Sequence, residues 1–148
     1  LFCAVDCKSR YGYFYCYKNI SSASGADFLE KVINYFPFRV DAIQTDNGSE
    51  YLLNFHKACT QLDLIHYFSF PHTPKMNGRA ERIIRTVVYE YLNWQYDLLP
   101  DLDEINRHCM IFNSKYNTKR FHQKLGYKTP QEYVNLHQTR KGGQPFSI

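Results

Sequence analysis

The stretch IQTDNGSEY, residues 43–51, decides how we interpret the fold of this chain. An apolar run over residues 40–45 predicts a short strand, and Asn47 and Gly48 supply the residues that turn the chain after it. Asp46 therefore lies at the end of a strand and faces a loop, which is a common place for a ligand or metal site. The same position also suits an acid that only forms a turn or caps a helix. Residues further along the chain decide between these interpretations.

Strand-like and helical patterns alternate along the rest of the chain. Strands are expected over residues 1–7, 11–17, 40–45 and 64–68, and helices over residues 23–36, 52–62, 79–98 and 102–116. Further on, Thr129-Pro130-Gln131-Glu132 is typical of a capping box with proline at the first helical position, and it predicts one more helix. This order of elements predicts an α/β sheet covered by helices.

Length and composition point to one globular domain. A chain of 148 residues can bury one good core, and we expect a domain over residues 1–137 and a tail or linker over residues 138–148. The formal net charge of +4 permits a nucleic-acid partner without establishing one, because domains built only for such binding are usually more basic. No stretch approaches the roughly 18 apolar residues of a membrane span, so no membrane partner is expected.

The cysteine and histidine patterns argue against a structural zinc site. The five cysteines form no C-x-x-C pair, and the six histidines show no zinc-finger spacing. Cys3, Cys7 and Cys16 lie on strand-like segments. Together with the odd total, this placement predicts reduced thiols that pack as small apolar groups in an intracellular protein.

A second informative acid, Glu81, lies early in the helix that follows a proline-rich loop. It is separated from Asp46 by 34 residues, which is enough chain to cross one face of an α/β sheet and return to the same edge. Two carboxylates from different elements suit Mg²⁺ or Mn²⁺, and a pair of metals about 4 Å apart requires such acids. The alternatives are an acid favoured by the helix dipole or an i,i+4 partner of Arg85.

Basic and polar residues surround Glu81 in the sequence. They are Lys75, Asn77, Arg79, Arg82 and Arg85. A basic helix face beside a carboxylate is what binding of a phosphate backbone next to a metal site would require. A charged face is also commonly only solvated surface, so this cluster supports the metal interpretation without deciding it.

Taken together, these motifs resemble a known family. TDNGSEY (residues 45–51) followed by PHTPKMNGRAERIIRT (71–86) resembles the catalytic core of the DDE recombinases, which are the retroviral-type integrases and bacterial insertion-sequence transposases. KYNTKRFHQKLGYKTPQEY (115–133) is similar to the tail of the insertion-sequence members, and AVDCKSRYGYFY (4–15) also fits. The resemblance covers nearly the whole chain.

The resemblance implies a ribonuclease-H-like mixed sheet flanked by helices. It implies that Asp46 and Glu81 are the second and third carboxylates of a two-metal Mg²⁺ or Mn²⁺ site, although their spacing of 34 departs by one from the family's commonest 35. The implied activity is metal-dependent hydrolysis at the ends of a DNA element, followed by transfer of the freed 3′-hydroxyl into target DNA. A homo-oligomer in the bacterial cytoplasm, associated with the nucleoid, is also implied.

The first acid of the family pattern is expected to be missing. Family members carry it on a central strand before the hairpin, whereas residues 4–15 resemble the second strand, its turn and the third. Asp6 is then expected to be a turn residue partnered by Lys8 or Arg10. We therefore expect this sequence to lack the central strand, and to be an inactive fragment or to fill the gap by swapping between protomers.

Two other interpretations of the chain stay open. One is a truncated or degenerate relative that binds DNA or assembles with partners but has lost the chemistry. The other is a ribonuclease-H-like nuclease without strand transfer, which the resemblance of the tail makes less favoured. Asp6 as the first catalytic acid also stays open.

Overall fold

The computed structural model describes residues 1–69, 74–92 and 101–141, with side chains described over 1–69, 81–90 and 101–137. Four short strands form two separate pairs within these residues. β1 (Phe2–Val5) pairs antiparallel with β2 (Gly12–Tyr15), and β3 (Ala42–Thr45) pairs parallel with β4 (Ile65–Phe68). The predicted strands are confirmed, but they are shorter than the patterns suggested.

Five helices surround these strands in the described residues. They are α1 (Ser22–Tyr35), α2 (Asn54–Gln61), α3 (Pro74–Val87), α4 (Leu102–Lys119) and α5 (Pro130–Lys141). α3 begins at Pro74 and not near residue 79, because proline is well suited to the first turn of a helix. A π-helical turn, Val88–Leu92, follows α3 where a continuous helix was expected to residue 98; residues 93–98 lie outside the described part. No helix in the described part of the chain is both long and apolar enough to span a bilayer.

The ends of two helices show why they begin where they do. The Ser21 hydroxyl accepts a hydrogen bond from the Ser24 N–H (3.1 Å) and caps α1. The predicted capping box of α5 is confirmed: the Glu132 N–H donates to Thr129 Oγ1 (3.2 Å), and the Thr129 N–H donates to Glu132 Oε2 (2.8 Å). α5 continues to Lys141, past the boundary expected at residue 137.

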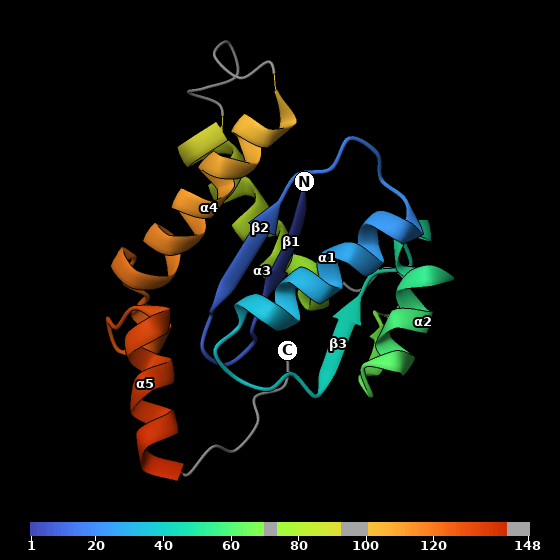
Figure 1. Cartoon of the computed structure of the whole chain (residues 1–148). Coiled ribbons are helices and arrows are strands. Elements are labelled where there is room, and N and C mark those ends of the chain that lie inside the picture. The colour runs from blue at the N-terminus through green and yellow to red at the C-terminus, as the bar shows by residue number, and fades with distance from the viewer. Residues whose placement is uncertain (70–73, 93–100, 142–148) are drawn as a thin grey trace.

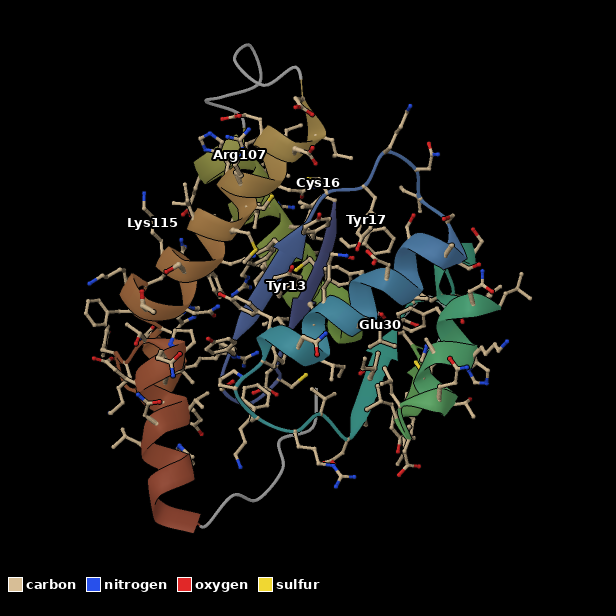
Figure 2. All side chains as sticks on the ribbon, in the orientation of Figure 1. Tyr13, Cys16, Tyr17, Glu30, Arg107 and Lys115 are labelled. Atoms are coloured by element: carbon tan, nitrogen blue, oxygen red, sulfur yellow. The ribbon has the colours of Figure 1, made fainter. Side chains whose placement is uncertain are left out.

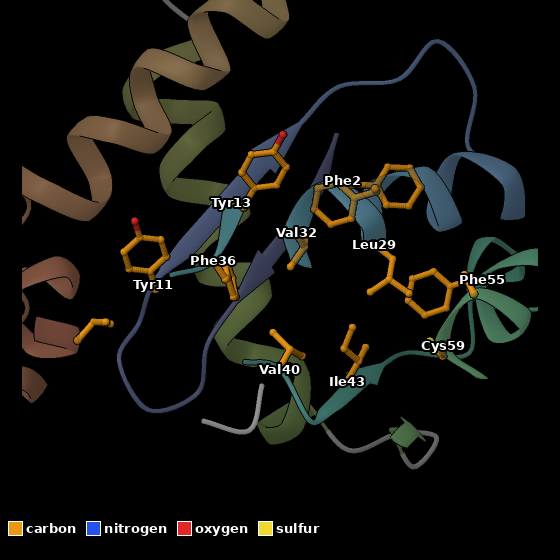
Figure 3. Packing of buried hydrophobic residues seen from close by; sticks show 13 residues of the cluster. Phe2, Tyr11, Tyr13, Leu29, Val32, Phe36, Val40, Ile43, Phe55 and Cys59 are labelled. Carbon is orange, nitrogen blue, oxygen red and sulfur yellow. The ribbon is translucent and has the colours of Figure 1, made fainter. Parts of the chain in front are cut away.

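Helices cover both faces of the β1–β2 hairpin. On one face, Phe28, Leu29 and Val32 of α1 pack with apolar residues of the hairpin, β3 and α2 in the larger core (Figure 3). On the other face, Phe14 packs with residues of α3 and α4 such as Val87. The hairpin is thus the middle of three layers, with α1 in front of it and α3 behind it in Figure 1.

Three asparagines of α4 cover the outer edge of β2. Each uses its amide oxygen to accept a backbone N–H and its amide nitrogen to donate to the carbonyl of the same residue. Asn117 pairs in this way with Gly12 (2.8 and 2.8 Å), Asn113 with Phe14 (2.9 and 3.1 Å) and Asn106 with Cys16 (2.8 and 3.0 Å). We call this set the asparagine ladder. It gives the strand edge the hydrogen bonds that a neighbouring strand would otherwise supply.

Candidate active site

The loop after β3 holds the first predicted acid in a fixed turn. Asp46 is exposed at the end of β3, and its Oδ1 accepts a hydrogen bond from the Gly48 N–H (3.0 Å). The Asn47 amide donates to the Ser69 carbonyl after β4 (3.2 Å) and ties the turn to the neighbouring strand. Asp46 therefore forms a turn, which was the alternative to a ligand role for this acid. Its carboxylate is nevertheless exposed to solvent.

A glycine in α1 fixes the next part of this loop. The 3₁₀ turn Ser49–Tyr51 packs so closely on α1 that a Cβ at Gly25 would lie 2.4 Å from the Glu50 carbonyl oxygen. Any larger residue at position 25 would push the turn away, because real side chains do not approach backbone to that distance. The position of the loop after Asp46 thus depends on α1 as well as on its own hydrogen bonds.

Asp46 and Glu81 line the same cavity. This cavity has a volume of about 220 Å³ and is bounded by residues of β1, α1, β3 and α3. Its walls are mainly apolar, with Cys3, Val5 and Ile43 among them, and the two carboxylates come from different elements. The structure therefore brings together the two acids that were predicted to converge from 34 residues apart in the sequence.

β1 forms backbone hydrogen bonds with β2 along one edge, and its other edge faces this cavity. Because α4 occupies the outer N–H and C=O of Phe14, its antiparallel partner Cys3 directs its own backbone groups to the opposite edge. The same alternation applies to Gly12 and its partner Val5. Among the described strands, β1 has β2 as its sole neighbour.

The edge of β3 that faces the cavity is similar. The Ile65 N–H of β4 donates to the Asp41 carbonyl (3.0 Å), which sets the alternation along β3. In a parallel pair this alternation directs the backbone groups of Ala42 and Gln44 away from β4. Within the described residues, β3 has no second neighbour either. The cavity thus separates two strand edges that both carry backbone donors and acceptors.

A chain of hydrogen bonds leads from the surface to the backbone of Asp46. Thr45 Oγ1 donates to the Asp46 carbonyl (2.9 Å) and lies 2.9 Å from His66 Nε2, so its oxygen can accept from that nitrogen. His66 Nδ1 lies 3.2 Å from His56 Nδ1, on α2. Burial lowers the pKa of His66, and the nearby His56 lowers it further.

Neither histidine was predicted to belong to this site. The two residues lie ten positions apart in the sequence, on a helix and on a strand, which matches no ligand motif. The signal that could have found His66 is strand pairing, because it is the register partner of Ile43, three residues before Asp46.

Comparisons with known proteins give matches to integrases. The family model described as "Integrase core domain" matches residues 63–130. The chain is 25% identical over 150 residues to the "Putative integrase ORF3" of Spiroplasma virus SpV1-C74, covering 88% of this chain and 40% of that protein. It is 34% identical over 86 residues to the "Retrovirus-related Pol polyprotein from transposon RE2" of Arabidopsis thaliana, covering 57% of this chain and 6% of that protein.

Solved structures share the fold. A chain of the simian T-cell lymphotropic virus intasome, in complex with PP2A regulatory subunit B56 gamma, matches with a TM-score of 0.73 and 25% identity, over 87% of this chain and 45% of that one. The catalytic core domain of BIV integrase matches with a TM-score of 0.71 and 20% identity, over 93% and 87%. These matches support an integrase/transposase core of the DDE type. The fold of the chain is ribonuclease-H-like, and the chain spans less than half the length of the curated relatives named above.

Asp6 lies in the hairpin turn and is fully buried. Its Oδ2 accepts hydrogen bonds from both the N–H and the hydroxyl of Ser9, which the sequence interpretation did not consider as a partner. Its backbone carbonyl accepts from the Arg10 N–H (3.0 Å). Val5 and Cys7 line the cavity, but Asp6 between them is not among the lining residues. This arrangement fits a turn-stabilising acid.

The predicted DNA-contacting residues lie along α3. Arg82 and Arg85 are exposed. Glu81, which precedes both of them on α3, is exposed as well. No ion pair joins Glu81 to Arg85, although the structure describes both side chains, so the i,i+4 interpretation of Glu81 finds no support. Lys75, Asn77 and Arg79 belong to the first part of α3, and their side chains lie outside the described ones.

Proposed function

We propose that this chain is the catalytic core of a DDE transposase or integrase, which hydrolyses DNA at element ends and joins the freed 3′-hydroxyl to target DNA. The observation that carries the proposal is the meeting of Asp46 and Glu81 at one cavity beside an open sheet edge. Similarity to integrases supports the reaction class. The competing proposal is a relative that binds DNA and assembles without chemistry.

The two acids fit a site for Mg²⁺ or Mn²⁺. Both are exposed, both supply hard oxygen ligands, and only one Asp46 oxygen is engaged by the Gly48 N–H. When bound, such a metal pair activates the attacking oxygen and stabilises the leaving one. The chain's own part is to hold Asp46 by its turn and by the Thr45 hydroxyl, and to bring Glu81 to the cavity on α3.

A third carboxylate is needed for a two-metal site. No group of three potential ligands (His, Cys, Asp or Glu) occurs in the part of the chain that the structure describes. We propose that a further strand, from the same polypeptide or from another copy, lies between β1 and β3 and carries this acid. Backbone groups of Cys3 and Val5 on one side, and of Ala42 and Gln44 on the other, would pair with it.

DNA is the proposed substrate, bound through its phosphates by α3. Arg82 and Arg85 are exposed next to Glu81, and Lys75, Asn77 and Arg79 extend the same helix toward its start. We further propose a homo-oligomer that acts in the cytoplasm at the bacterial nucleoid. The domain is proposed to span residues 1–137, with residues 138–148 as a tail or linker.

The proposal is tested with a polypeptide that contains this chain together with the further strand and its acid. On duplex DNA with pre-cut ends and Mg²⁺ or Mn²⁺, the wild type is expected to carry out strand transfer. Asp46→Asn and Glu81→Gln should each abolish it, while Asp6→Asn should keep most of it. Residues 1–148 alone should be inactive. DNA binding without activity in the wild-type polypeptide would favour the non-catalytic alternative, and loss of activity in Asp6→Asn would make Asp6 the first catalytic acid.

Metal binding gives a readout that does not depend on activity. Mn²⁺ added to the chain should broaden the NMR signals of residues around Asp46 and Glu81, because a paramagnetic ion acts on nearby nuclei. Asp46→Asn should weaken this binding. Broadening confined to other parts of the chain would contradict the assignment of the site.

A further inference from the structure

Two thiols meet at the end of the asparagine ladder, on the side of the hairpin away from the cavity. Cys16, labelled in Figure 2, follows β2 and is half-buried. Cys109 lies on α4 and is buried. Their sulfur atoms are 4.0 Å apart, and both are free thiols. They lie 93 positions apart in the sequence, so the contact is a product of the fold.

The asparagine ladder fixes the backbones that carry these thiols. Asn106 bonds to both the N–H and the C=O of Cys16, at 2.8 and 3.0 Å. Cys109 lies three positions after Asn106, on the same side of α4. The next rung, between Asn113 and Phe14, holds the helix against the strand on the other side of Cys109. Rotation about the side-chain bonds is therefore the main movement that the two sulfurs need in order to meet.

The environment makes the two thiols chemically different. A hydrogen bond from Cys109 lowers the pKa of Cys16 to about 7, against the opposing effect of burial. The same hydrogen bond and burial raise the pKa of Cys109 far above its ordinary value. Either sulfur can be the donor at 4.0 Å, and the lowered pKa of Cys16 favours Cys16 as the thiolate and Cys109 as the S–H donor. The thiolate is the reactive form of cysteine, and Cys16 is also the more exposed of the two.

We propose that Cys16 is an oxidative modification site, at which a hydroperoxide oxidises the thiol and Cys109 then closes a Cys16–Cys109 disulfide. In the first step the Cys16 thiolate attacks one peroxide oxygen, the O–O bond breaks, and an alcohol or water leaves with a proton from solvent. In the second step Cys109 gives its proton to solvent and attacks the Cys16 sulfur, while hydroxide leaves and is protonated to water. Two thiols are oxidised by two electrons, and one peroxide is reduced.

The disulfide would join α4 to the end of β2. The sulfurs must approach from 4.0 Å to about 2.05 Å, and we propose that rotation of the two side chains about χ1 brings them together. A cross-link between residues so far apart in the sequence restricts the unfolded chain strongly. Oxidation is therefore expected to raise the melting temperature of the whole chain and to hold the asparagine ladder closed.

The experiment treats the full chain with hydrogen peroxide and maps its disulfides by mass spectrometry under non-reducing conditions. The expected product is a peptide pair joined through Cys16 and Cys109, with a melting temperature several degrees above that of the reduced protein. Cys16→Ser should remove both effects. Cys7→Ser is the matched control, because it removes an exposed cysteine and should leave both effects unchanged.

A second variant keeps the proposal testable if the disulfide is not isolated. In Cys109→Ala, Cys16 has no resolving thiol at 4.0 Å, and its sulfenic acid should accumulate and be trapped by dimedone. The proposal is overturned if peroxide modifies Cys7 while Cys16 stays reduced. It is also overturned if the disulfide that forms joins any other pair of cysteines, or if Cys109→Ala yields no dimedone adduct at Cys16.

Discussion

Two kinds of strand edge occur in this fold, and both carry backbone N–H and C=O groups. The outer edge of β2 is covered by α4, whereas the edges of β1 and β3 that face each other border the cavity. Asparagine side chains of α4 form hydrogen bonds with the outward backbone groups of Gly12, Phe14 and Cys16. On the other side of the hairpin, Cys3 faces a cavity of about 220 Å³. A strand edge that is satisfied by side chains cannot accept another strand. Within the described residues, this fold is therefore closed on its α4 side and open on the side where Asp46 and Glu81 lie.

The largest expected effect comes from breaking the closed side. Asn113→Leu keeps the size of the fully buried side chain but removes both hydrogen bonds to Phe14, whose N–H and C=O are then left unsatisfied. Each such group costs about 1–3 kcal/mol, so the free energy of unfolding should fall by about 3 kcal/mol or more. Urea denaturation measures this change.

A matched control is available on the same helix. Lys115→Leu places the same leucine on the exposed face of α4 and should change the stability by no more than about 0.5 kcal/mol (Figure 2). Equal urea midpoints for the two variants would mean that the asparagine ladder does not hold the strand edge.

A second, smaller effect compares the two edges directly in the wild-type chain. Hydrogen exchange of the Cys3 and Val5 amides, which face the cavity, should be at least about tenfold faster than exchange of the Gly12 and Phe14 amides, which donate to asparagines. NMR of the reduced chain in D₂O gives the individual rates. Equal protection of all four amides would show that the cavity edge is already satisfied.

The order of strands and helices could be predicted because its signals are local. The apolar spacing of α1 and the capping box at Thr129 and Glu132 depend on residues close together in the chain, and both are confirmed. The start of α3 was predicted too late, because Pro74 was taken as part of the preceding loop and not as a first-turn residue.

The asparagine ladder was not predicted, because it depends on how α4 meets a strand about 100 residues away. A signal was nevertheless present. Asn106, Asn113 and Asn117 are spaced by seven and four positions, so they share one face of a helix, and Cys109 and Tyr116 on that side are apolar. Polar residues on a buried helix face require partners, and a strand edge is one source of them.

The residues of the candidate site that belong to local motifs could be predicted, and those that depend on long-range packing could not. Asp46 and Glu81 were recognised from motifs that combine local turn chemistry with a resemblance, and the structure brings them to one cavity. His56 and His66 were missed, because their contact depends on the packing of α2 on β4. Spacing alone carries no information about such a contact.

A third prediction contrasts DNA binding on the two sides of the molecule. Arg82 is exposed on α3 beside the cavity, and Lys115 is exposed on α4 on the closed side. Arg82→Ala should weaken duplex binding similarly for all sequences and reduce the slope of log K against log salt by about 0.9, the value for one lost phosphate contact. Lys115→Ala should leave the slope unchanged. Fluorescence anisotropy at several salt concentrations measures both, and an equal loss for Lys115→Ala would remove the contrast.

The smallest expected effect is on the pH dependence of stability. The amides of the asparagine ladder do not titrate, whereas His66 on the open side has a pKa lowered by burial and by His56. A histidine with a lowered pKa in the folded state binds fewer protons there than in the unfolded chain. Its contribution to stability is therefore fully present above the unfolded pKa of about 6.5 and is lost as the pH falls through the lower, folded value.

His66→Gln tests this assignment, since glutamine can still donate to the Thr45 oxygen but does not titrate. Urea midpoints measured from pH 7.5 down to pH 5 should fall less steeply in the variant than in the wild type. Some pH dependence should remain in both proteins, because burial, followed by the nearby Arg120 and Arg10, lowers the pKa of His122, and the pKa of Cys16 on the closed side is lowered to about 7. An unchanged slope in His66→Gln would show that the hydrogen-bond chain from His56 to the Asp46 carbonyl does not depend on the charge of His66. The open side would then be no more sensitive to pH than the closed one.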